Sequence, residues 1–186
     1  MSLSILSVVL GLALALVQLW QLLQPDAWRR WSTAFPRSRS LGYVLVLGAT
    51  AWFLWNVKNE TLADFTKFKP FLLAGFAAIG VLTCIYVTDF LAARGFALVL
   101  LLVAKLMVDV ARWHESEWRW MITGLAYVWV IAGIWFTISP WRLRDLLAWE
   151  NASDRRLRAL AVSRLAYALM LVVLGLTVFP SDGGGA

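Results

Sequence analysis

The chain has 186 residues, of which 61% are hydrophobic and 15% charged, and its formal net charge is +6. This composition lies outside the usual range of soluble domains, and at roughly 20 apolar residues per span it fills about six membrane helices. It therefore predicts an all-α, polytopic membrane bundle without a separate soluble domain. The basic residues gather in two connections between apolar segments, which indicates membrane orientation, so we expect no nucleic-acid partner.

Side chains that hold cofactors are scarce. The sequence has one cysteine, Cys84, within an apolar run, and one histidine, His114. A single cysteine excludes an intrachain disulfide, a cysteine-based zinc site and an iron–sulfur cluster built by this chain alone. Glu115 and Glu117 follow His114, but this spacing matches no zinc pattern. We therefore expect no metal, no cofactor and no catalytic residues, that is, a protein that is not an enzyme.

The first apolar segment covers residues 4–24, with no basic residue before it and several arginines after it. A cleaved signal peptide has the opposite charge polarity, so we expect a permanent first helix with its N-terminus outside. The connection 25–39 contains four arginines and one acid and should therefore be cytoplasmic. The candidates for contact with the interface or with lipid headgroups in this connection are Trp28, Arg29 and Arg30.

The second and third spans are expected at about 40–57 and 70–91. The second ends in tryptophans and Lys58, as a span does at an interface. The outer loop then carries Asn59-Glu60-Thr61, a sequon that matters only in a host that glycosylates it. Small residues crowd one half of the third span and predict close helix packing there.

The fourth span, about 96–112, follows an expected tight turn at 92–95 and contains two charged residues. Lys105 should lie near the bilayer midplane, with Asp109 one helical turn further on. A charge at that depth costs roughly 2.5–3.5 kcal/mol on insertion scales, so we expect a structural or a functional role to offset this cost. Opposite charges four residues apart can pair and neutralise each other.

The fifth and sixth spans are expected at about 120–138 and 160–179. The connection between them, 140–158, is rich in arginine and should also be cytoplasmic, which leaves the C-terminus outside. Its first part alternates apolar residues and arginines in a way that suits a short helix lying in the interface. The candidates for interface contact here are Trp141, Arg142 and Arg144. Together these segments predict a multi-pass protein of the plasma or inner membrane.

Two segments, 17–55 and 133–179, share a plan. In each, an apolar span ends at a proline, a Trp-Arg pair follows, and the chain re-enters the membrane at an arginine and a tyrosine. Such segments would form a parallel repeat with the third and fourth spans inserted between them. Unrelated cytoplasmic loops share these features too, so the sequence leaves duplication and coincidence both open.

Two functions agree with these features. The first is a non-catalytic accessory or assembly subunit of a membrane complex, which binds a membrane partner and, through its arginines, anionic lipid headgroups. In that case Lys105 and Asp109 pair with each other or with a charge on a partner's helix. The alternative is a small ion or solute transporter or channel, working as a homo-oligomer. In that case a polar path is lined by Lys105, Asp109, Asp89 and Tyr86.

Overall fold

The computed structural model describes residues 2–60, 66–87, 89–114 and 116–179. Within these ranges the chain is helical, without strands, and six of its helices are long and apolar enough to cross a membrane. The all-α prediction is thus confirmed. The chain forms two compact units. The first unit is Met1–Thr33, Val103–Ile131 and Asp145–Ala186, and the second unit is Ala34–Leu102 and Ala132–Arg144.

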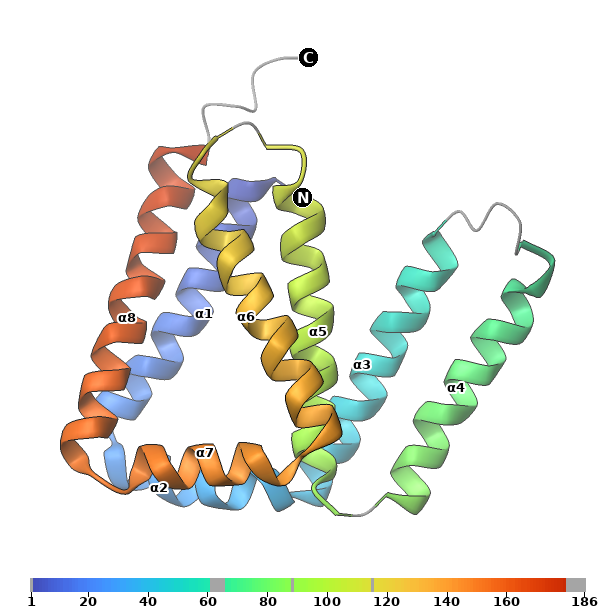
Figure 1. Ribbon diagram of the computed structural model, residues 1–186, viewed down its shortest axis with the longest axis horizontal. Helices are drawn as coiled ribbons and strands as arrows, with labels where there is room; N and C mark the ends of the chain where they lie inside the picture. Colours follow the sequence, from blue (N-terminus) through green and yellow to red (C-terminus); the bar gives the residue numbers. More distant parts are fainter. Residues whose placement is uncertain (1, 61–65, 88, 115, 180–186) are drawn as a thin grey trace. The chain divides into compact units, whose positions relative to one another are not determined.

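The six long helices follow the six expected spans in order (Figure 1). They are α1 (Leu3–Leu23), α3 (Arg39–Asn59), α4 (Lys69–Tyr86), α5 (Leu91–Ala111), α6 (Arg119–Ile138) and α8 (Asp154–Thr177). The helices α1, α3 and α6 begin and end within two residues of the expected bounds. The largest differences are at the end of α4 and the start of α5 and α8.

The turn expected at 92–95 is wrong, because these residues form the first turn of α5. Alanine and arginine, which occupy 92–94, are strong helix formers. Gly95 allows close packing: a Cβ there would lie 2.6 Å from Cβ of Leu45. Instead, α4 ends at Tyr86 and α5 begins at Leu91, and Phe90, directly before α5, has a φ of 55°.

Both arginine-rich connections contain a short helix, α2 (Pro25–Ala34) and α7 (Trp141–Asn151). The second of these was expected, whereas α2 was not. Pro25 ends α1 but also starts α2, because proline is favoured at the first helical position, where no N–H donor is needed. Trp28 and Ser32, one turn apart, give α2 a buried face. Two 3-10 turns lie at Phe35–Arg37 and Thr66–Phe68.

In the first unit, α1 and α8 pack closely along their length and run antiparallel. Near one end, Ser4 Oγ donates a 2.6 Å hydrogen bond to the carbonyl oxygen of Gly175. Further along, a Cβ on Gly11 would lie 2.7 Å from the carbonyl oxygen of Ala168. Small residues at these positions let the two backbones approach each other, as they do in membrane helix pairs.

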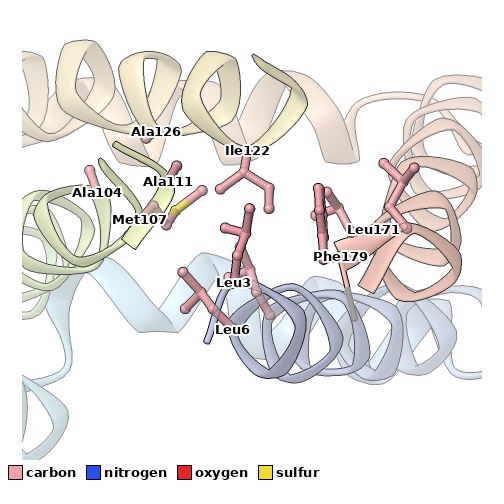
Figure 2. Close-up of a cluster of buried hydrophobic side chains, with 11 residues drawn as sticks. Leu3, Leu6, Ala104, Met107, Ala111, Ile122, Ala126, Leu171 and Phe179 are labelled. Carbon is pink, nitrogen blue, oxygen red and sulfur yellow. The ribbon is translucent and has the colours of Figure 1, made fainter. Parts of the chain in front are cut away.

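The N-terminal parts of α1 and α6 and the C-terminal parts of α5 and α8 enclose the apolar core of the first unit (Figure 2). Its fully buried members include Met107 on α5, Ile122 on α6 and Leu171 on α8. On α5, Ala104, Met107 and Ala111 are spaced three and four residues apart and are buried, so this face of the helix points into the core.

In the second unit, α3 and α4 form an antiparallel hairpin (Figure 1). Gly80 permits a close approach, because a Cβ there would lie 2.5 Å from Oγ1 of Thr50. Phe53 and Phe76 pack edge to face, with 4.9 Å between ring centroids. The close helix packing expected from the small residues of the third span is thus observed at Gly80.

Candidate functional site

A buried carboxylate lies at the end of the first unit where α7 meets α8. Glu150, near the C-terminus of α7, is only 2% exposed. Its Oε1 accepts a 2.9 Å hydrogen bond from Nη1 of Arg164, and its Oε2 accepts a 3.0 Å bond from Nη2. A parallel pair of this kind fixes both side chains. Because a buried carboxylate is costly unless it is paired, Arg164 is required by the fold around Glu150.

The amide of Gln21 completes this arrangement from α1. Its Nε2 donates a 2.6 Å hydrogen bond to Oε1 of Glu150, and the side chain of Gln21 is fully buried. Residues 21 and 150 are far apart in sequence, so this bond ties α1 to α7, while the bonds of Arg164 tie α7 to α8. Glu150 therefore joins three helices of the first unit. We call Gln21, Glu150 and Arg164 the carboxylate junction.

Further polar contacts hold α2 against the same end of the unit. Nδ2 of Asn151 donates a 2.8 Å hydrogen bond to Oγ of Ser32, and Arg29 forms an ion pair with Asp154. A cluster of three tryptophan rings adds apolar contact, with centroids 5.4 to 5.5 Å apart; its members are Trp20, Trp28 and Trp31. The helix α2 is thus held by both polar and aromatic contacts.

A pocket of about 350 Å³ opens beside the carboxylate junction, between α1, α6 and α8. Its apolar wall consists of Leu14, Leu125, Val128 and Trp129, and its polar wall of Gln18, Ser163, Arg164 and Tyr167. Gln18 is 5% exposed, and its Oε1 has no hydrogen-bond partner among the described residues. Apolar walls with a few converging polar groups are typical of ligand sites.

Several polar side chains that line the pocket already form hydrogen bonds within the protein. The hydroxyl of Tyr167 donates a 2.7 Å bond to the carbonyl oxygen of Met121, and that of Ser163 donates a 3.0 Å bond to the carbonyl oxygen of Leu160. Arg164 carries five N–H donors, and the bonds to Glu150 use two of them. Its side chain remains 43% exposed, whereas that of Glu150 is 3% exposed. Arg164 therefore lines the pocket, while the carboxylate of Glu150 that pairs with it is buried.

Lys105 and Asp109 form the expected ion pair on α5. Their Nζ and Oδ2 atoms are 2.5 Å apart, and their side chains are 44% and 49% exposed. The pair lies away from the buried face made by Ala104, Met107 and Ala111. Because α5 begins at Leu91, its midpoint is residue 101, and at 1.5 Å per residue Lys105 lies about 6 Å beyond it. Lys105 therefore lies toward the C-terminal end of α5, and its depth in a membrane stays a prediction.

Tyr86 and Asp89 belong to the second unit, and neither lies in the middle of a helix. Tyr86 is the last residue of α4 and is 78% exposed, and Asp89 is exposed in the connection to α5. Both therefore lie at the end of a candidate span, where a polar side chain can reach the interface.

The candidate interface residues fall into two groups. Arg30 and Trp141 are exposed. Arg142 lies over the ring of Trp135 and Arg144 over that of Phe90, at 6.0 and 5.8 Å from the centroids. By contrast, Trp28 is 6% exposed within the tryptophan cluster, and Arg29 is paired with Asp154. The first group faces outward, whereas the second holds α2 in place.

Sequence reasoning did not single out the carboxylate junction or Gln18. One signal was present: Gln18 and Gln21 are three residues apart in the otherwise apolar run 8–23 and so share a helix face. Nothing local connects them with Glu150, since the contact depends on the tertiary packing of α1, α7 and α8. Among the described residues, no three His, Cys, Asp or Glu side chains gather as a metal ion would require.

No family model, curated protein or solved structure matches this chain. Any assignment of function therefore rests on the geometry described above.

Proposed function

We propose that this chain is a non-catalytic, multi-pass membrane protein that acts as an accessory or assembly subunit of a membrane complex. The partner is a transmembrane helix with a polar or charged side chain, and it packs on the face of α5 that carries Lys105 and Asp109. The observation behind this proposal is the exposure of that ion pair on an apolar helix.

Charges within a membrane usually face a bundle interior or a water-filled cavity and are paired. Lys105 and Asp109 are paired, but about half of each side chain is left uncovered by this chain. A partner helix on that face would exclude lipid from the pair and supply further hydrogen bonds. Its association would then depend on these two side chains.

The test is gentle extraction from the native membrane followed by native mass spectrometry. The wild-type chain should carry a stoichiometric partner, and Lys105→Ala should lose it while the chain itself remains folded. Retention of the same partner by Lys105→Ala and by Asp109→Ala would overturn this docking face.

A homo-oligomeric transporter or channel is the second candidate, and the same exposed pair motivates it. If copies of the chain pack through α5, the Lys105–Asp109 pairs would line a path between them. This candidate requires a homo-oligomer with no other partner, together with a flux into liposomes that Lys105→Ala and Asp109→Asn abolish. An unchanged flux in both variants would exclude it.

We further propose that the chain resides in a plasma or inner membrane, with both termini outside and residues 25–39 and 140–158 in the cytoplasm. The support is the concentration of arginine in these two connections. Both contain a short helix with exposed arginines, among them Arg30 and Arg142, which suits contact with anionic headgroups.

A further inference from the structure

The pocket between α1, α6 and α8 takes no part in the docking of a partner on α5, yet it has the features of a binding site. Of its eight lining residues, Arg164 alone is charged. The carboxylate that neutralises this arginine is buried, so a molecule in the pocket meets the guanidinium and not Glu150. An oxyanion is the complementary ligand.

The guanidinium is also held in place before any ligand arrives. Its two hydrogen bonds to Glu150, at 2.9 and 3.0 Å, fix the plane of the group, and three N–H donors remain after these two are subtracted from five. Gln18 lies in the same wall, but its Oε1, which has no partner among the described residues, is an acceptor and adds no bond to an oxyanion. Fixed donors bind a ligand at a lower entropic cost than mobile ones.

The size of the pocket limits the rest of the ligand. About 350 Å³ is near the lower end of the range of small-molecule sites, which runs from roughly 300 to 1,000 Å³. This space suits a small head and the first part of one chain, and the opposite wall, with Leu125 and Trp129, is apolar. The remainder of a long chain would leave the pocket past Val128, which is exposed, and enter the bilayer.

We infer that this pocket binds a long-chain fatty acid, with its carboxylate on Arg164 and its chain against the apolar wall. A carboxylate matches the planar fork of an arginine, and a single chain matches the available volume.

The test uses the full chain in phosphatidylcholine vesicles with spin-labelled stearic acid, whose protein-bound fraction is resolved by electron paramagnetic resonance. Its neutral methyl ester and spin-labelled phosphatidylglycerol are measured in parallel. We expect the acid to associate about tenfold more strongly than the ester, a ratio that corresponds to about 1.4 kcal/mol. Equal association of acid and ester would overturn the proposal. Preference for phosphatidylglycerol over the acid would also overturn it and assign the pocket to a bilayer lipid.

Two kinds of variant locate the binding. Val128→Trp should fill the pocket and abolish the preference for the acid, whereas Ile131→Trp, on the same helix but outside the pocket, should retain it. The double variant Glu150→Gln, Arg164→Gln removes both charges with little change in shape and should bring the acid to the level of the ester. An unchanged preference in the Val128→Trp protein, or in a folded double variant, would contradict the proposed site.

Discussion

Arg164 and Glu150 face each other through two parallel hydrogen bonds of 2.9 and 3.0 Å, but only the carboxylate of this pair is buried. The asymmetry has a consequence for stability. Loss of the arginine would strand a carboxylate away from water, whereas neutralisation of the carboxylate would leave a partly hydrated guanidinium. The two partners are therefore not equivalent in mutation.

We predict that Arg164→Ala destabilises the fold more than Glu150→Gln. The cost of leaving a buried charge unpaired is about 3–5 kcal/mol when both partners are buried, and less here because Arg164 is partly exposed. Glu150→Gln keeps the shape and an acceptor for Gln21, so we expect a loss of about 1 kcal/mol. Thermal unfolding in detergent, followed by tryptophan fluorescence, would compare the two. A lower melting temperature for Glu150→Gln would contradict the prediction.

Packing of α1 against α8 depends on glycine at position 11. In Gly11→Ala the new Cβ would lie 2.7 Å from the carbonyl oxygen of Ala168, so the two helices must move apart. We expect destabilisation of about 1–3 kcal/mol, as for other overpacked interiors. Gly124→Ala is the matched control, because no atom lies within 4 Å of its Cβ and alanine favours the helix by up to about 1 kcal/mol. Equal melting temperatures for both variants would argue against close packing.

The tryptophan cluster should hold α2 against the first unit. Trp28 is 6% exposed, so Trp28→Ala removes a large buried ring and should cost about 3 kcal/mol or more. Hydrogen exchange in α2 should rise accordingly. Trp141→Ala, which truncates a ring that is 46% exposed, should change stability by less than about 1 kcal/mol. Similar effects of both variants would show that Trp28 is not an anchor.

The proposed orientation can be read from cysteine labelling. Cys84 is buried, so the wild-type chain should react slowly with a membrane-impermeant maleimide. In a Cys84→Ser background, we expect Arg30→Cys and Arg158→Cys to be labelled from the cytoplasmic side, and Lys58→Cys from the outside. The opposite pattern would reverse the topology, and labelling of all three from one side would contradict six spans.

The elements that could be predicted from the sequence are those governed by local composition. The apolar length of each span sets the positions of α1, α3 and α6, and the spacing of Lys105 and Asp109 sets their ion pair. The start of α5 was misplaced because Gly95 indicates a turn in sequence but provides helix packing in the structure. Residues brought together only by tertiary packing, such as Gln21 and Glu150, carry no local signal of their contact.

The most direct test of the proposed function is a charge exchange on α5. Lys105→Asp combined with Asp109→Lys keeps the ion pair within the chain and also adopts the more favourable order along the helix. It reverses the charges that a partner helix would meet. Native mass spectrometry of the gently extracted protein should show a folded chain without the partner that the wild-type chain carries. Retention of that partner would show that the pair acts only within this chain and would contradict the proposed docking face.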